Sequence, residues 1–346
     1  MVTIKDIARA VGVAHSTVSR ALNGDPRISK ATREKVLQAA RELNYRPNLP
    51  ARALARGRVL SIGLVVPDVS EPFYGRIVAG VDRVTFDAGF NLVLYITHAD
   101  RQRELAALEQ IRHGRVDGMI LMIRKARAQA VVELKEQGVP LVLLLQKIRG
   151  SGIDSVRIDN VGGAAEAVRH LIDGGHRRIA LISGPSHAPD ARERIKGYRA
   201  ALDQAGIPYC EELVVRGDFS FASGFRAVDA LLRGPASQWP TAIFAANDHM
   251  AMGAIKRLAE RGIAVPRDIA VVGFDDIAPA AYFQPSLTTV RQPIDESGRK
   301  AAELLIARIQ GAVQEPREIV LKTELVVRES CGAGQARERP RACAGS

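Results

Sequence analysis

Apolar residues recur along the chain at two different spacings, and the change between them divides it into two regions. Up to about residue 45 they recur every three or four positions, as at Ile4, Ile7 and Val11, which predicts short amphipathic helices. From Val59 onward, short apolar runs alternate with longer amphipathic stretches. This alternation predicts parallel β-sheets with helices on both faces.

Two successive series of strands and helices are predicted in the second region. The first series has strands at 60–66, 92–96, 119–123 and 141–145, with helices near 74–88, 102–113 and 127–137. The second has strands at 179–182, 241–245 and 269–273, with helices near 161–173, 191–204, 221–232 and 248–261. Two sheets in succession predict two lobes with a cleft between them. In such folds, ligands bind at the carboxyl ends of the strands.

The first region is predicted to form an all-α helix-turn-helix domain over residues 1–47. Thr3 and Asp6 have the spacing of a capping box, and Gly12 supplies a turn before a second helix at 15–22. Ser29 is positioned to cap a third helix, whose buried stripe is Val36, Ala39, Ala40 and Leu43. The second helix then leaves polar side chains mainly on its outer face: His15, Ser16, Thr17, Ser19 and Arg20.

Positive charge is concentrated in the same part of the chain. Residues 1–58 hold 12 Lys and Arg against 4 Asp and Glu, so +8 of the formal net charge of +11 lies there. A strongly basic N-terminal region followed by a nearly neutral remainder is typical of a nucleic-acid-binding protein. We expect the second helix to enter the major groove, where Arg20 pairs with guanine and His15 and Ser16 read neighbouring base edges. The alternative is a helical bundle that binds protein.

The first 56 residues resemble the DNA-binding head of the LacI/GalR family of bacterial transcriptional regulators. The resemblance rests on Thr3-Ile-Lys-Asp-Ile-Ala8, Val13-Ala-His-Ser-Thr-Val-Ser-Arg-Ala-Leu-Asn23 and Asn44-Tyr-Arg-Pro-Asn48. It implies that His15, Ser16 and Arg20 read bases, and that Thr3, Thr17, Ser19 and Asn23 hold phosphates. Ala14 departs from the family pattern, which usually has a serine that caps the helix and contacts a phosphate. This end of the helix is therefore expected to rely on Thr17.

Residues 48–58 resemble the hinge helix and linker of the family. In the family this segment folds only on operator DNA, and the resemblance implies that Leu54 wedges into the minor groove. Prying base steps apart with an apolar side chain kinks the duplex at a cost of roughly a few kcal/mol. The alternative for Leu54 is a linker residue that packs on the next domain.

The resemblance continues to about residue 330, over the effector-binding core of the family, whose two-lobed fold is related to periplasmic sugar-binding proteins. Family segments here include Val116-Asp-Gly-Met-Ile, Ser183-Gly-Pro, Val272-Gly-Phe-Asp-Asp276 and Pro285-Ser-Leu-Thr-Thr-Val. The fold implies crossings between lobes near 157–159, 288–291 and 318–322. Lobe one then comprises about 59–157 and 291–318, and lobe two about 158–290 and 319–330. Residues 331–346 are rich in Gly, Ala and Arg and are predicted to be a disordered tail.

Polar side chains fall where predicted strands end, and they suit a sugar-like ligand. Asn247 and Asp248 follow one strand, Asp275 and Asp276 follow another, and Arg194 lies on the helix after Ser183-Gly-Pro. Sugar hydroxyls donate and accept hydrogen bonds, so they suit Asp, Asn and Arg, with an aromatic ring against the apolar face. The predicted effector residues are Phe73, His98, Asp190, Arg194, Phe219, Asn247, Asp275 and Gln292. Of these, His98, Asp190 and Gln292 come from the family resemblance.

Several of these residues have a structural alternative. Asn247 or Asp248 is also placed to cap the next helix, and capping is the favoured role for Asp248. The alternative for Asp276 is that it fixes a loop. The alternative for Arg194 is that it is a solvated residue on the surface of its helix. For Phe73, His98, Asp190 and Gln292, ligand contact and a structural role are equally open. After Val139-Pro140, where many family members carry Asp at the strand end, this chain has Leu145-Gln146, which leaves the effector class open.

The sequence gives no indication of an enzyme or a metal site. It has no P-loop, no Gly-x-Ser-x-Gly elbow and no zinc-type cluster among its seven histidines. No apolar run reaches the roughly 18 residues of a membrane span. Charged residues such as Lys5 and Arg9 argue against a signal peptide. Three cysteines without metal spacing fit a reduced cytoplasm.

The resemblance therefore implies a homodimeric DNA-binding repressor in the bacterial cytoplasm, on the nucleoid. Helices 73–88 and 101–113 are expected to form part of the dimer face, and the paired heads to bind near-palindromic double-stranded DNA. A small-molecule effector, a sugar or sugar derivative, is expected between the lobes, and no cofactor is expected. The alternatives are a purine-like corepressor, a protein co-effector or, in another class, a cytoplasmic sugar-binding or sugar-processing protein.

Overall fold

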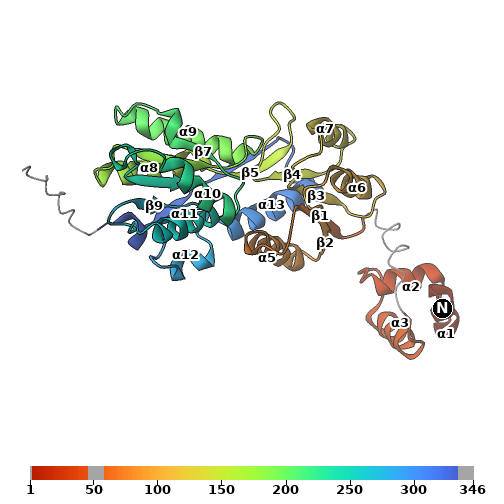
Figure 1. Cartoon of the computed structure of the whole chain (residues 1–346). Coiled ribbons are helices and arrows are strands. Elements are labelled where there is room, and N and C mark those ends of the chain that lie inside the picture. Colours follow the sequence, from red (N-terminus) through yellow and green to blue (C-terminus); the bar gives the residue numbers. More distant parts are fainter. Residues whose placement is uncertain (1, 46–57, 334–346) are drawn as a thin grey trace, which may run out of the picture. The chain divides into compact units, whose positions relative to one another are not determined.

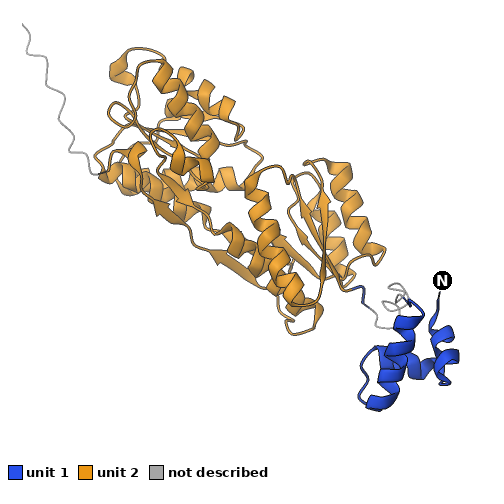
Figure 2. Cartoon of the chain, turned by 90° about the horizontal axis from the view of Figure 1, so that it is seen from below, with its two compact units in different colours: residues 1–59 blue, residues 60–346 orange. Residues whose placement is uncertain are grey.

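The chain folds into two compact units, which comprise residues 1–59 and 60–346 (Figures 1 and 2). The computed structural model describes residues 2–45 and 58–333. The predicted hinge with its Leu54, and all but the start of the predicted tail, lie outside the described residues. None of the helices in the described ranges is both long and apolar enough to cross a membrane.

The described part of unit 1 comprises α1 Ile4–Val11, α2 His15–Leu22 and α3 Lys30–Glu42. Their apolar faces meet in one small core, in which Ile7, Val18 and Val36 are fully buried. Gly12 follows α1 with a φ of 72°, a left-handed conformation that glycine adopts without steric cost, and turns the chain toward α2. The helix-turn-helix predicted from apolar spacing is confirmed.

Local side-chain contacts mark where the helices of unit 1 begin. The Asp6 carboxylate accepts hydrogen bonds from the backbone N–H of Thr3 at 2.9 Å and from the Thr3 hydroxyl at 2.8 Å. Ser29 accepts a hydrogen bond from the backbone N–H of Thr32 at 3.2 Å. These contacts satisfy polar groups that the first turn of a helix leaves without an intrahelical partner.

The first sheet of unit 2 is parallel, with the strand order β11-β5-β4-β3-β1-β2 (Figure 1). Its strands are β1 Ser61–Val66, β2 Asn91–Ile96, β3 Gly118–Leu121, β4 Leu141–Leu144, β5 Asp154–Ile158 and β11 Glu318–Leu321. Helices α5 Pro72–Asp87 and α13 Ile294–Ile309 pack on one face, and α6 Arg101–Arg112 and α7 Ala128–Glu136 on the other. We call this sheet with its helices lobe one.

Strand β1 shows how the sheet of lobe one is buried on both faces. Ile62, Leu64 and Val66 pack with α5 and α13, whereas Val65 packs with α6 and α7. Successive side chains of a strand point to opposite faces, so a strand covered on both sides is apolar throughout. Helices α5 and α13 cross closely, because a Cβ at Gly80 would lie 2.3 Å from the carbonyl oxygen of Asp295.

The second sheet is also parallel, with the strand order β7-β6-β8-β9. Its strands are β6 Ile179–Ser183, β7 Val214–Arg216, β8 Ala242–Ala245 and β9 Ala270–Val272. Helices α8 Asn160–Asp173 and α9 Pro189–Gln204 cover one face, and α10 Phe221–Leu231 and α11 Asp248–Glu260 cover the other. The short helix α12 Ala278–Tyr282 follows β9. We call this sheet with its helices lobe two.

The chain passes between the lobes after β5, after β10 and after β11. Strand β5 ends at Ile158 and α8 begins at Asn160. Strands β10 Thr289–Arg291 and β12 Glu324–Val326 form an antiparallel pair that contacts α8, while β11 between them pairs with β5 of lobe one. Lobe one therefore reaches Leu321, slightly beyond the boundary expected at about 318.

The C-terminal end of the core corrects one prediction. A 3₁₀ turn at Glu329–Cys331 packs on lobe two, and Cys331 is buried with its Sγ 3.3 Å from Nε2 of His170. Cys331 therefore belongs to the core, and the prediction that the disordered tail begins there is wrong.

Candidate functional site

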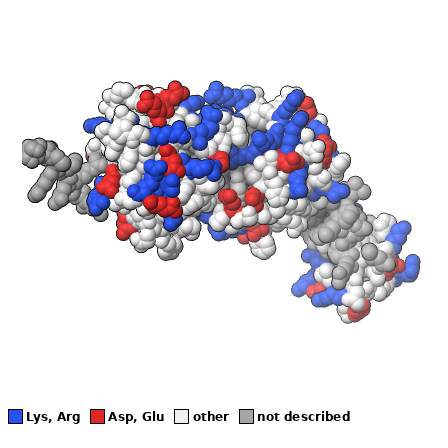
Figure 3. Space-filling view, in the orientation of Figure 1, with Lys and Arg blue, Asp and Glu red and all other residues white. Residues whose placement is uncertain are grey.

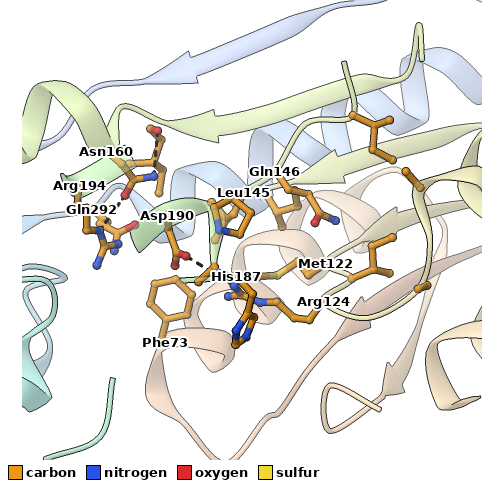
Figure 4. A pocket seen from close by; sticks show the side chains of 18 residues that line it. Phe73, Met122, Arg124, Leu145, Gln146, Asn160, His187, Asp190, Arg194 and Gln292 are labelled. Atoms are coloured by element: carbon orange, nitrogen blue, oxygen red, sulfur yellow. Dashed lines mark hydrogen bonds and ion pairs between the residues drawn. The ribbon is translucent and has the colours of Figure 1, made fainter. Parts of the chain in front are cut away.

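A cavity of about 230 Å³ lies between the two lobes, near the carboxyl ends of their strands (Figure 4). Lobe one contributes Arg124 after β3 and Gln146 after β4, and lobe two contributes Asp190 and Arg194 from α9. An adjoining hollow of about 280 Å³ shares part of this wall. The shared residues are Phe73, Arg124, Asp190, Arg194 and Gln292, and the hollow adds Phe219, Asn247 and Asp275. The two hollows form one site.

Arg194 links several residues of the cavity wall through polar contacts. Its side chain is 4% exposed and forms an ion pair with Asp275, with 3.3 Å between Nη1 and Oδ1. Nε donates to Oδ1 of Asn160 at 3.1 Å, and Nη1 donates to the carbonyl of Ala246. The guanidinium also lies over the ring of Phe274, 3.8 Å from its centroid. Arg194 is therefore fixed in place, and the alternative of a solvated helix residue is wrong.

Asp275 is a carboxyl group whose ionisation is held near neutral pH. Burial raises its pKa to about 6, against the opposing influence of Arg194 and of a hydrogen bond from Nε2 of Gln292 at 2.5 Å. An ionised carboxylate only accepts hydrogen bonds, whereas a protonated one also donates. The contacts that this side chain can offer a ligand therefore change with pH.

The two aspartates near Asp275 have structural roles. Asp276 pairs with Arg328 at 2.6 Å and with Arg291 at 2.7 Å. Burial works against its ionisation, but hydrogen bonds from the two arginines outweigh burial and lower its pKa. Asp248 is fully buried, which raises its pKa, and it accepts hydrogen bonds from the N–H of Ile277 and the hydroxyl of Thr289. Asp276 therefore fixes a loop, and the favoured capping role for Asp248 is wrong.

Asn247 caps α11 and also lines the cavity. Its Oδ1 accepts a hydrogen bond from the N–H of Met250 at 3.0 Å, and its Nδ2 donates to the carbonyl of Phe219 at 2.9 Å. Phe219 has a φ of 71°, and a Cβ at Gly184 would lie 2.3 Å from its ring. A cap and a close glycine contact thus hold an aromatic side chain in the wall of the cavity.

The structure brings together all of the predicted effector residues except His98. Phe73 and Asp190 line both hollows, and the Asp190 carboxylate lies 3.8 Å from Nη1 of Arg124. His98 follows β2, is exposed, and lines neither of these two hollows. The residues that favour a ligand here thus come from both lobes, but His98 is not one of them.

Arg124 and Asn160 line the site without having been predicted. Arg124 comes shortly after β3, which ends at Leu121, so the rule that pointed to Asn247 and Asp275 also applies to it. Its loop is held by Glu104 of α6, which is fully buried and accepts hydrogen bonds from the backbone N–H groups of Arg124, Lys125 and Ala126 at 2.7, 2.8 and 2.5 Å. The sequence around Arg124 does not predict this contact, because Glu104 lies 20 residues earlier in the chain, on α6.

The predicted base-reading residues His15, Ser16 and Arg20 are exposed on α2, whereas the phosphate candidates Thr17 and Ser19 are half-buried. The other two phosphate candidates make local contacts. The Thr3 hydroxyl donates to Asp6, and Nδ2 of Asn23 donates to the carbonyl of Ser19 at 2.9 Å. Within residues 2–45 and 58–333, no cluster of His, Cys, Asp and Glu suits a metal ion.

Comparison with known proteins identifies the family. Residues 3–48 match the model described as bacterial regulatory proteins, lacI family, and residues 168–331 match a periplasmic binding protein-like domain. The chain is 39% identical over 332 residues to the ribose operon repressor of Escherichia coli (strain K12), covering 95% of this chain and 100% of that protein. The chain belongs to the LacI family.

Two solved structures of LacI-family proteins resemble this one over nearly its whole length. One, described as the Lac repressor dimer bound to operator and the anti-inducer ONPF, has a TM-score of 0.84 and 31% identity, covering 95% of this chain and 99% of that one. The other, described as a complex of the transcriptional regulator CelR with cellobiose, has a TM-score of 0.72 and 39% identity, covering 95% and 100%.

The structure shows the surroundings of Ala14 and Gln146, the two positions at which this LacI-family chain departs from the expected pattern. Ala14 precedes α2 and offers no side-chain cap, and the N–H of Thr17 bonds to its carbonyl oxygen at 2.9 Å. Gln146 lines the cavity, and its Nε2 donates to the carbonyl of Leu121 at 3.1 Å. An amide side chain, which carries no charge, therefore stands at this point of the lobe-one wall.

Proposed function

We propose that this LacI-family protein is a sequence-specific DNA-binding repressor whose operator affinity is controlled by a small ligand bound between its lobes. The observation that carries the proposal is the cavity, in which Arg124 and Gln146 of lobe one face Asp190 and Arg194 of lobe two. A ligand there contacts both lobes at once. The same chain carries a helix-turn-helix with exposed polar side chains on α2.

The ligand that suits this wall is a sugar or sugar derivative. Carboxylate, amide and guanidinium groups of Asp275, Gln292 and Arg194 converge on the site, and the rings of Phe73 and Phe219 supply flat apolar surfaces. Alternating donors and acceptors with an aromatic face match a ring of hydroxyl groups. The cellobiose complex of CelR and the name of the ribose operon repressor support this class.

The proposed mechanism couples the ligand site to DNA through the angle between the lobes. The connections after β5, β10 and β11 join the lobes, so a ligand that contacts both favours one relative angle. In a dimer, that angle alters the subunit interface and with it the affinity for the operator. The Lac repressor dimer, to which the chain is similar, supports self-association. As a DNA-binding regulator, the protein would act on the nucleoid in the bacterial cytoplasm.

A melting-temperature screen of the full-length protein against sugars, sugar acids, sugar phosphates, nucleosides and purines tests the ligand half of the proposal. A ligand at about 100 times its dissociation constant adds roughly 2.7 kcal/mol of stability, a shift of a few degrees. A hit that disappears in Asp275→Asn assigns the ligand to the cavity between the lobes. No hit across the panel would contradict control by a small ligand of these classes.

A further inference from the structure

A second cavity between the lobes, of about 380 Å³, is strongly basic. Five cationic side chains line it, Lys147, Arg149, Arg157, Arg192 and Lys196, and the one acidic side chain in its wall is Glu193. We call this cavity the basic recess. Lys147, Arg149 and Arg157 belong to lobe one, whereas Arg192 and Lys196 project from α9 of lobe two. Figure 3 shows Lys and Arg side chains gathered on the face of the core between α9 and β4.

Neighbouring carboxylates neutralise only part of this charge. Glu318 forms ion pairs with Lys147 and with Arg157, and Arg157 also pairs with Glu193 at 3.1 Å. Arg192 donates instead to the backbone carbonyls of Ser186 and His187. Among the residues that the structure describes, Arg149, Arg192 and Lys196 have no acidic side chain within ion-pair distance. Like charges gathered in a recess attract an anion more strongly than the same charges on an open surface.

The basic recess adjoins the effector cavity. Gln146 and Asn160 line both, together with Leu145, Ile158 and Pro189. Asn160 also joins them by hydrogen bonds, because its Nδ2 donates to Glu193 at 3.0 Å and its Oδ1 accepts from Arg194 at 3.1 Å. Arg194 in turn pairs with Asp275. An anion that draws Arg157 away from Glu193 would therefore act on the contacts of the effector site.

We propose that the basic recess binds a phosphate group, which bridges Arg149 of lobe one and Arg192 and Lys196 of lobe two. Phosphate suits the recess because guanidinium groups bind its oxygens with paired hydrogen bonds and lysine adds a point charge. By joining cations of both lobes, the phosphate offsets their mutual repulsion and favours the lobe angle that keeps them together. The phosphate is either that of a phosphorylated effector, whose neutral part occupies the adjoining cavity, or that of a free phosphate ion.

The test uses inorganic phosphate and pyrophosphate with the full-length protein, at ionic strength held constant with sodium chloride. The double variant Arg149→Gln/Lys196→Gln removes the cations of the recess. The matched control Arg169→Gln/Lys135→Gln removes the same charges from exposed helix positions outside it. Calorimetry and melting temperature should both show saturable binding by the wild type and the control, with at least tenfold lower affinity in the recess variant.

A second arm distinguishes the two sources of phosphate by comparing a hexose with its 6-phosphate. If the group belongs to the effector, the phosphorylated sugar binds more tightly than the neutral one in the wild type, and this advantage disappears in the recess variant. If the group is a free ion, inorganic phosphate binds and phosphorylation of the sugar adds nothing. This arm rests on the proposed sugar site, whereas the phosphate arm does not.

Equal responses of the recess and control variants, or a response that sodium chloride reproduces, would overturn the proposal. Binding of short single-stranded DNA through the same cations, without any response to phosphate, would overturn it as well. Neither result touches the proposed function, because the phosphate arm involves neither operator DNA nor a neutral sugar.

Discussion

The guanidinium of Arg194 and the carboxylate of Asp275 form an ion pair in the wall of the cavity between the lobes, with 3.3 Å between Nη1 and Oδ1. Arg194 also bonds to Asn160, directly after the crossing from β5 to α8. One side chain therefore connects the ligand site with a segment that joins the lobes. Under the proposed function, a ligand that contacts Arg194 would therefore also act on the connection between the lobes.

Replacing Arg194 with alanine should lower the free energy of unfolding by about 3 kcal/mol, because Asp275 and Asn160 then keep buried polar atoms without this partner. Urea denaturation measures the effect. Arg169→Ala, at an exposed position of α8, is the matched control and should change stability by less than about 0.5 kcal/mol. Equal effects of the two substitutions would show that the buried contacts of Arg194 do not contribute to the free energy of unfolding.

The raised pKa of Asp275 predicts a pH dependence with a definite sign. Its pKa is about 6 in the folded protein against an ordinary value of 3.8, so the folded state binds the proton more tightly. The stability that this group contributes is present below about pH 4 and is lost as the pH rises to about 6. Between pH 4 and 7, Asp275→Asn should therefore lose less stability than the wild type, by roughly 2 kcal/mol. Parallel curves for the two proteins, measured by urea denaturation, would contradict the assignment.

Replacing Glu104 with glutamine should loosen the loop that presents Arg124 to the cavity. The carboxylate accepts three backbone hydrogen bonds, and an amide cannot accept as many. We expect a loss of roughly 2 kcal/mol in stability and weaker binding of any ligand found in the screen. Glu109→Gln, on the same helix but at an exposed ion pair with Arg112, is the control and should cost less than about 1 kcal/mol. Unchanged ligand affinity in Glu104→Gln would show that Arg124 does not contribute to ligand binding.

Arg20→Ala tests the DNA half of the proposed function. Arg20 is exposed on α2, where a guanidinium can reach the guanine edge in the major groove. The substitution should weaken operator binding by about 1–3 kcal/mol and relax the preference at one base pair, as measured by selection from a randomised DNA library. Arg41→Ala on α3 removes the same charge and should leave the sequence preference unchanged. A uniform loss of affinity in both variants, without relaxed specificity, would mean that Arg20 contacts only phosphates.

The sequence predicts elements whose apolar pattern is local and misses those that depend on distant partners. Strands β1, β3 and β4 are apolar because both of their faces are covered, so they are visible as runs. Strand β5 contains Asp154 and Arg157, and the buried Asp154 pairs with Arg308 of α13 at 2.7 Å and accepts a hydrogen bond from the N–H of Arg317. The sequence around Asp154 does not predict that it pairs with Arg308, which lies far along the chain.

The same distinction holds for the site. The sequence predicts Asn247 and Asp275 because polar residues at strand ends converge in a parallel fold, and the same rule applies to Arg124. Which role each side chain takes is set by the tertiary structure. Asn247 rather than Asp248 caps α11, and Asp248 is drawn inward by Thr289 and Ile277. His98, chosen on resemblance alone, lies outside the cavity because of where the loop after β2 places it.

Fluorescence anisotropy of labelled operator DNA tests most directly whether one ligand between the lobes controls DNA binding. The ligand from the melting-temperature screen is titrated into the protein–operator complex, with Asp275→Asn as the matched variant. We predict that operator affinity changes by at least fivefold at saturation in the wild type and by much less in the variant, in line with ordinary coupling energies. A fall in affinity identifies an inducer, and a rise identifies a corepressor. A ligand that saturates the cavity and leaves operator affinity unchanged would contradict the account.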